Sequence, residues 1–234
     1  MRRDLIEEAL RLFFRYFDLF TLIALTVWLP GHLAINYADF FAGGKGTTAA
    51  AARSFRVALM VEGICGPLVV AGTLAALLAI RRGQAPRYLS AMRWAFLAWP
   101  RLFVARLVVS AVVLAGFVLL VVPGVLALVR LAFVDSLVVI DDLPIGRALS
   151  LSNRLTAGRR WGIFWAGGII FVGVFLVAAT VSALASLADH FVVQVMADCL
   201  IAVTQTVFTI TMFVFYWEAR RQASAAAAPS GPGA

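Results

Sequence analysis

Five ionisable side chains interrupt long apolar stretches of this sequence: Glu62, Arg106, Arg130, Asp135 and Asp198. A charge in the hydrocarbon of a bilayer costs about 2.5–3.5 kcal/mol or more at its centre, so such residues face the inside of a bundle and pair. They are also the residues that bind ions, protons or lipid headgroups in membrane proteins. Two interpretations stay open: a polar functional site, or structural salt bridges that fix helix packing.

The depth of each charge along its stretch predicts its partners. A helix rises about 1.5 Å per residue, which places Glu62, Arg130 and Asp198 about 8–10 Å below the outer ends of their helices. Arg106 and Asp135 lie about 6–8 Å from the inner face by the same measure. We therefore expect an outer cluster of Glu62, Arg130 and Asp198 and an inner pair of Arg106 and Asp135. Arg106 could instead extend its long side chain to the inner surface.

Other chemistry finds little support in the sequence. Cys65 and Cys199 fall in apolar stretches, and His32 and His190 stand alone, without metal-ligand spacing. No serine elbow, zinc-binding helix motif or Cys–His arrangement is present. The expectation is a protein that is not an enzyme and that holds no cofactor and no metal.

The composition indicates what positions these charges. Of 234 residues, 63% are hydrophobic and 14% are charged, and the mean hydropathy is +0.96. Soluble domains are about 45–50% apolar and about 25% charged. The soluble, disordered and coiled-coil classes are therefore excluded, and an integral membrane protein is predicted.

Six apolar segments are long enough to cross a bilayer core of about 30 Å, which takes roughly 20 helical residues. The third and fourth are separated only by Pro123-Gly124, a pair that favours a tight turn and hence a helical hairpin. We predict one all-α membrane domain over residues 1–221 and a disordered tail over 222–234, which is rich in Ala, Pro, Ser and Gly. The predicted spans are 17–37, 57–80, 102–122, 124–140, 162–187 and 191–217.

The basic residues predict the orientation. With both termini inside, 15 of the 20 Lys and Arg residues fall on the inner side, three fall on the outer side, and Arg106 and Arg130 lie within spans. Such a bias marks the cytoplasmic side of a membrane protein. The net charge of +8 is then a membrane-surface feature, and nucleic acid is not an expected partner.

The inner segments are amphipathic. Residues 2–16, 86–99 and 143–157 each carry apolar side chains on one face and Arg on another, which is typical of interfacial helices against anionic headgroups. Each could also be the first turns of the following span. The two interpretations are evenly balanced for the first segment, whereas Pro144 and Gly158 favour a separate third helix. The order of inner helix, span out and span back then occurs three times, giving three helix-hairpin units with two or three cytoplasmic amphipathic helices.

Two stretches carry a family resemblance. One is Val122-Pro123-Gly124 followed by Arg130, and the other runs from Ala148 to Trp161 as ALSLSNRLTAGRRW. Together they resemble a broad family of bacterial six-helix membrane proteins that includes the YciC-like inner-membrane proteins. The pattern is also similar to the membrane domain attached to some glycerophosphodiester phosphodiesterases. The positions that carry the resemblance are Pro123, Gly124, Ser150, Leu155, Gly158 and Trp161.

The resemblance implies a fold and a location in the bacterial cytoplasmic membrane, not an enzyme activity. In the phosphodiesterases the chemistry belongs to a separate soluble barrel, for which this chain has no room.

The leading hypothesis is a non-enzymatic scaffold or accessory subunit that interacts with the bilayer, with anionic lipid headgroups at the cytoplasmic face, and with a protein partner or a second copy. The alternative is a small oligomeric transporter or channel that uses the outer cluster. A water-accessible cavity reaching that cluster favours transport, and a dry, fully paired cluster favours the scaffold.

Overall fold

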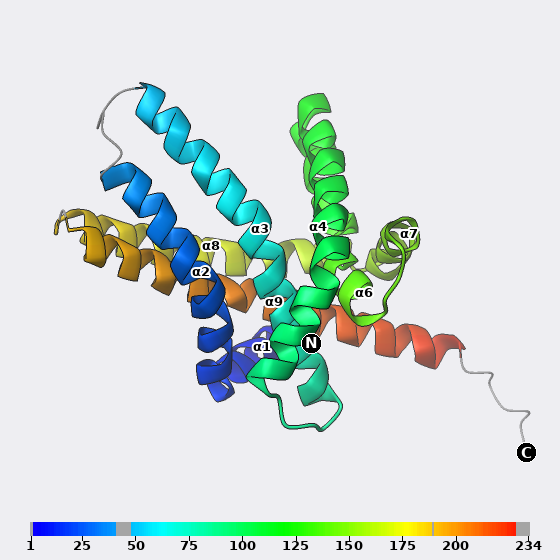
Figure 1. The fold of residues 1–234 in the computed structure, drawn as a ribbon. Coiled ribbons are helices and arrows are strands. Elements are labelled where there is room, and N and C mark those ends of the chain that lie inside the picture. Colours follow the sequence, from blue (N-terminus) through cyan, green and yellow to red (C-terminus); the bar gives the residue numbers. More distant parts are fainter. Residues whose placement is uncertain (1, 41–47, 189, 228–234) are drawn as a thin grey trace, which may run out of the picture.

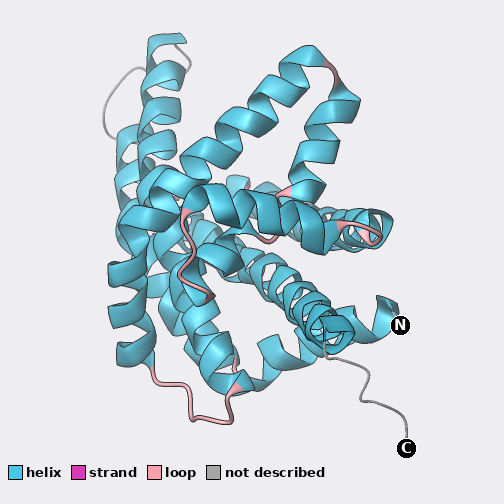
Figure 2. Cartoon of the chain, turned by 90° about the vertical axis from the view of Figure 1, so that its right-hand side faces the viewer, coloured by secondary structure: helices cyan, strands magenta, loops and turns pink. Residues whose placement is uncertain are grey.

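The computed structural model describes residues 2–40, 48–188 and 190–227, and within these ranges the regular structure is entirely helical (Figures 1 and 2). Six helical stretches are long and apolar enough to cross a membrane, so the predicted all-α, multi-pass fold is confirmed. The helices are α1 (Arg2–Arg15), α2 (Phe17–Phe40), α3 (Thr48–Arg81), α4 (Tyr88–Leu119), α5 (Val121–Arg130), α6 (Val134–Ile140), α7 (Ile145–Thr156), α8 (Arg160–Ser186) and α9 (Phe191–Ala227).

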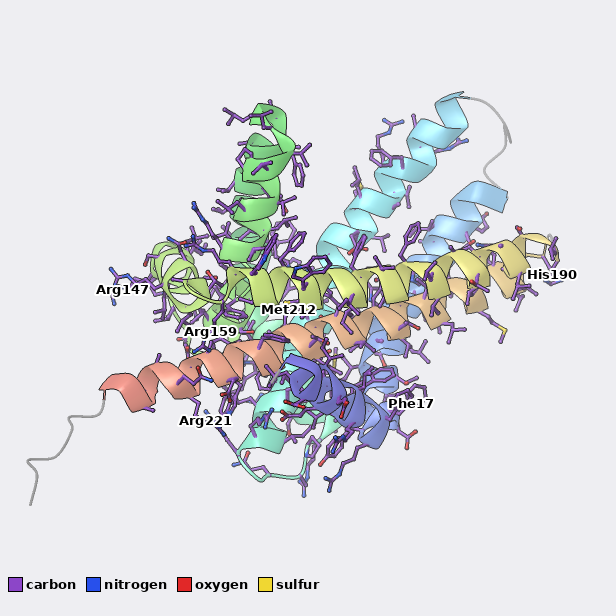
Figure 3. The ribbon with its side chains drawn as sticks, turned by 180° about the vertical axis from the view of Figure 1, so that it is seen from behind. Phe17, Arg147, Arg159, His190, Met212 and Arg221 are labelled. Carbon is purple, nitrogen blue, oxygen red and sulfur yellow. The ribbon has the colours of Figure 1, made fainter. Side chains whose placement is uncertain are left out.

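Three helical hairpins splay from a common base. They are α2–α3, α4–α5 and α8–α9, and Figure 1 shows their tips diverging. The long helix α9 is central to this base, because it packs against α1, α2, α3, α7 and α8. Arg147, Arg159 and Arg221 lie toward one end of the α8–α9 hairpin and His190 lies at the other (Figure 3). The three predicted helix-hairpin units are present.

The core lies where the helices converge. Its largest fully buried side chains come from α2, α3, α4, α6 and α9 and from the turn before α6, and they include Phe20, Leu74, Leu77, Leu102, Phe133, Leu137, Ile210, Phe213 and Tyr216. By contrast, residues 118–122 at the tip of the α4–α5 hairpin are all exposed and apolar. The tip of the α4–α5 hairpin therefore presents apolar side chains outward, as expected for contact with lipid, whereas the base is packed like a protein interior.

Two of the three amphipathic segments are separate helices. Helix α1 ends at Arg15, and the chain changes direction at Tyr16 before α2 begins (Figure 3). Helix α7 begins after Pro144, and Gly158 follows its end with φ +76°, a left-handed conformation that glycine adopts without strain.

The segment over 86–99 is not a separate helix, so of its two interpretations the second one holds, in which it forms the first turns of the following span. Helix α4 runs without a break from Tyr88 to Leu119, with Pro100 inside it. Its 32 residues span about 48 Å, more than the hydrocarbon thickness. Proline removes one helical hydrogen bond and bends a helix without necessarily ending it. The amphipathic segment therefore forms the first turns of the span.

The hairpin turn lies three residues before the predicted Pro123-Gly124. Leu120 is the extended residue between α4 and α5, and Pro123 sits in the first turn of α5, where its missing N–H costs nothing. Gly116 and Gly124 do not form the turn, but they allow α4 and α5 to approach each other closely. A Cβ on Gly116 would lie 2.9 Å from the Gly124 Cα, and one on Gly124 would lie 2.5 Å from the Phe117 ring.

The predicted span 124–140 is interrupted, and the predicted tail is partly helical. A turn over 131–133 separates α5 from α6, although both together form one span-length stretch. Helix α9 continues to Ala227, so it includes residues 222–227 of the predicted tail, and 228–234 lie outside the described residues.

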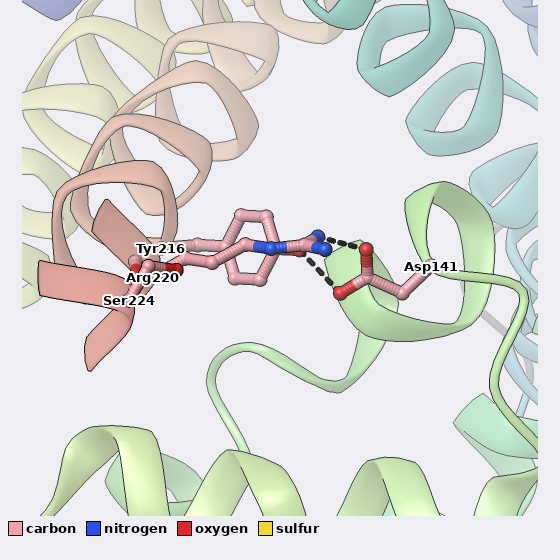
Figure 4. A network of polar contacts seen from close by, with 4 residues as sticks. All are labelled: Asp141, Tyr216, Arg220 and Ser224. Atoms are coloured by element: carbon pink, nitrogen blue, oxygen red, sulfur yellow. Dashed lines mark hydrogen bonds and ion pairs between the residues drawn. The ribbon is translucent and has the colours of Figure 1, made fainter. Parts of the chain in front are cut away.

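Polar contacts at the base join the segments that the charge bias assigns to one side. Arg81 at the end of α3 pairs with Glu8 of α1, and Arg101 of α4 pairs with Asp142. Figure 4 shows the third contact, where the Tyr216 hydroxyl donates to Asp141 Oδ2 over 2.7 Å and Arg220 pairs with the same carboxylate. The Arg220 Nη1 also donates to the Tyr216 hydroxyl over 2.8 Å.

Replacing Gly116 by Ala should destabilise the α4–α5 hairpin, because the new methyl group would meet backbone atoms that cannot move aside. We expect a loss of about 1–3 kcal/mol in the free energy of unfolding, measured by thermal unfolding in detergent. Gly168→Ala on α8 is the matched control, because no atom lies within 4 Å of its Cβ position. Equal losses for the two variants would contradict the close-approach role.

Candidate functional site

The structure brings the predicted inner pair together. Arg106 of α4 donates from Nε and Nη2 to Oδ2 of Asp135 over 3.1 and 2.8 Å. The two side chains are 33% and 30% exposed, so the contact is largely shielded from the surroundings. Charge-assisted bonds of this length are about twice as strong as neutral ones. The ion pair therefore fixes α6, the short helix after the interruption, against α4.

The three residues expected to form an outer cluster lie at three separate places, so that prediction is wrong. Glu62 of α3 lies beside Arg106 instead. A Cβ on Gly66 would sit 3.3 Å from both Glu62 Oε1 and Arg106 Nη1, so the carboxylate and the guanidinium flank the same glycine. We call Glu62, Arg106 and Asp135 the central ionic group.

Small residues on α3 allow α4 to approach the central ionic group. A Cβ on Gly63 would lie 3.9 Å from the Phe103 ring, and Phe103 stacks on Trp99 with 5.5 Å between ring centroids. The Trp99 indole Nε1 donates to the Ile64 carbonyl over 2.8 Å, which fixes the register of the two helices. Pro67 lies within α3 and has no N–H to donate to the Gly63 carbonyl, four residues earlier.

Asp198 finds a neutral partner between α2 and α9. The Asn36 Nδ2 donates to Asp198 Oδ2 over 2.7 Å and to the His32 carbonyl over 3.0 Å. Asn36 is only 3% exposed. Asp198 also acts electrostatically on His32, which stacks on Trp28 with 5.2 Å between ring centroids. Asn36 carries no charge, so a search for oppositely charged partners of Asp198 in the sequence does not find it.

Arg130 lies at the end of α5 in a groove between that helix and α7. The cavity measures about 440 Å³. Within the described residues, no carboxylate or carbonyl accepts a hydrogen bond from the Arg130 guanidinium, and its Nε is buried without a partner. The groove is lined by Val112, Pro123, Leu126, Ala127, Arg130, Leu131, Gly146, Leu149, Ser150 and Asn153.

Ser152 of α7 forms hydrogen bonds to the chain at the edge of this groove, and nothing in its sequence context predicts that role. Its hydroxyl donates to the Arg130 carbonyl over 2.8 Å and accepts from the Phe133 N–H over 3.3 Å. Both backbone groups belong to the interruption between α5 and α6. Ser152 is fully buried. Its hydroxyl therefore replaces hydrogen bonds that the interrupted helix does not make and that water cannot supply at this place.

The interruption also explains why depth counting misplaced Arg130. The depth of Arg130 was predicted for one straight helix over 124–140. The turn over 131–133 interrupts that helix and lets α7 pack against α5. Arg130 and Asp135 therefore belong to different helices and serve different sites.

The positions that carry the family resemblance have separable roles. Pro123 and Ser150 line the groove, and Gly124 packs within the hairpin. Leu155 packs against the core, whereas Trp161 is exposed and stacks on Phe164 with 5.5 Å between ring centroids. Gly158 provides the left-handed residue after α7.

Comparison of the chain with protein-family models, with curated proteins and with solved structures finds no match. Among the described residues, no group of three or more His, Cys, Asp or Glu side chains is placed to hold a metal ion.

Ser152→Ala should destabilise the fold, because it leaves the buried Phe133 N–H without an acceptor. We expect a loss of about 1–3 kcal/mol in the free energy of unfolding, measured by denaturation in mixed detergent micelles. Ser224→Ala is the control, because its exposed hydroxyl donates to the Arg220 carbonyl near the end of α9. A Ser152 variant as stable as the Ser224 variant would show that the interruption does not need this hydroxyl.

Proposed function

We propose that this multi-pass protein is a non-enzymatic, lipid-interacting scaffold or accessory subunit that binds an anionic phospholipid in the groove between α5 and α7. The observation that supports this most is the Arg130 guanidinium, which lies in the groove and has no acceptor in the part of the chain that the structure describes. A partly buried cationic group of this kind favours an anion, and a planar guanidinium fits the oxygens of a phosphate.

The rest of the groove suits a lipid. Leu126, Leu131 and Leu149 offer apolar contact for the start of the acyl chains. Asn153 accepts from Arg160 over 2.9 Å through its Oδ1, so its amide N–H groups are available to the ligand. A volume of about 440 Å³ suits a headgroup and its glycerol rather than a whole lipid, so the chains would leave the groove along the apolar side of α4.

The location of the groove fits the charge distribution. Helix α7 forms one wall and carries Arg147 and Arg154, which belong to the Arg-rich side of the chain. We place this side in the cytoplasm, with both termini there and the protein in the bacterial cytoplasmic membrane. The resemblance to YciC-like proteins, which lies in the same segments, supports that assignment.

The hairpin tips offer a further surface for association. Side chains such as Val118 and Leu187 are exposed and apolar, so lipid, a second copy of the chain or a partner subunit would cover them. The alternative function, a small oligomeric transporter, rests on the central ionic group, because charges within a span often mark an ion path.

Arg130→Ala should weaken the binding of an anionic lipid by about tenfold or more, because a charge-assisted bond to the phosphate is lost. The measurement is the affinity of the purified protein for phosphatidylglycerol, read by native mass spectrometry, with phosphatidylcholine as the neutral comparison.

The control is Arg147→Ala, which removes an exposed charge from α7 outside the groove. An equal loss for both variants would mean that surface charge alone attracts the lipid, and the groove proposal would fail.

A further inference from the structure

Glu62 lies in a membrane-spanning helix, and none of the residues that the structure describes forms a hydrogen bond or ion pair with its carboxylate. It lies within the candidate span Phe55–Arg81, and its side chain is exposed on the surface of the bundle. Arg106 is the charged group that acts on it, but Arg106 directs Nε and Nη2 to Asp135. Two carboxylates therefore lie near one guanidinium, which is paired with Asp135 alone. The central ionic group would carry one excess negative charge if both were ionised.

Hydrogen-bond acceptors also exceed donors on this face of α3. Pro67 supplies no N–H to the Gly63 carbonyl, which follows Glu62 directly in the chain. The nearby indole of Trp99 already donates to Ile64. A protonated carboxyl group would remove the excess charge and add an O–H donor at the same place.

We propose that Glu62 reversibly binds a proton within the membrane-spanning part of the protein. In the protonated state Glu62 is neutral, and Arg106 stays with Asp135. When the proton leaves to water, the Glu62 carboxylate competes with Asp135 for Arg106, whose Nη1 already faces α3. The proton therefore decides whether the guanidinium joins α4 to α6 alone or also to α3.

Few other charges act on this site. Helix α4 contributes Arg106 and α6 contributes Asp135, whereas α2 meets this stretch of α3 at Gly31. The charged residue in the apolar part of α9 is Asp198, and it accepts a hydrogen bond from Asn36. Cys65 is the titratable neighbour on α3 itself. The proposal is independent of the lipid groove, which lies between α5 and α7.

The test is modification by dicyclohexylcarbodiimide, an apolar reagent that reacts with protonated carboxyl groups. The intact protein in lipid nanodiscs is treated across a pH series, and the modified residue is located by peptide mass spectrometry. We expect Glu62 to be modified, with a yield that falls as the pH rises from about 5 to about 9, because the reagent needs the protonated carboxyl group and apolar surroundings favour that form. Glu62→Gln should abolish this modification.

A second variant separates the proposal from simple exposure. Asp135→Asn frees Arg106 to pair with Glu62, which favours the ionised carboxylate and should lower its modification at neutral pH by about tenfold or more. Asp142→Asn is the matched control, because it breaks the Arg101 ion pair away from the central ionic group and should leave the yield unchanged.

Three results would overturn the proposal: no modification of Glu62 at any pH, a yield that does not change with pH, or an Asp135→Asn variant that is modified as strongly as the wild type. Protection by sodium chloride but not by choline chloride would assign the site to Na⁺ and would also overturn it. If Asp135→Asn does not fold, the pH series and Glu62→Gln decide the question.

Discussion

The ion pair between Arg106 and Asp135 is the interaction on which the interrupted fourth span depends. A helix that stops at Arg130 and restarts at Val134 gives up backbone hydrogen bonds in a medium that offers none in return. The ion pair fastens the restarted helix to α4, and the Ser152 hydroxyl satisfies the interruption itself. With α6 held in place, the chain continues into α7, which forms one wall of the groove.

Much of the architecture could be predicted because a bilayer imposes a simple rule on composition. Apolar spans of about 20 residues are expected to be helical, and the distribution of Arg residues predicts which ends of the spans face the cytoplasm. The ends of the individual helices were harder to predict, since they depend on how the helices pack against one another. Pro123 was predicted to lie in the hairpin turn. The chain turns at Leu120, and Pro123 lies in the first turn of α5. Pro100 stayed within α4, so a segment expected to lie apart continues into the span.

The candidate sites were predictable only where both partners carry a charge. Arg106 and Asp135 lie together because opposite charges in a span seek each other, whereas Asp198 is satisfied by the neutral amide of Asn36. Depth along a helix gave the wrong neighbour for Glu62, because the splay of the hairpins brings α3 and α4 together at Gly63 and Gly66. Neutral hydrogen-bonding residues inside apolar spans therefore merit the same attention as charges.

The apolar tip of the α4–α5 hairpin bears on how the protein enters the membrane. Between Gly116 and Gly124 the chain carries no polar side chain, and the turn closes its own backbone hydrogen bonds, from the Leu120 N–H to Gly116 and from the Gly124 N–H to Leu120. Moving this tip into the bilayer requires no charge to be dehydrated. The α2–α3 connection, in contrast, includes Lys45, so its insertion carries a translocation cost that the α4–α5 hairpin avoids.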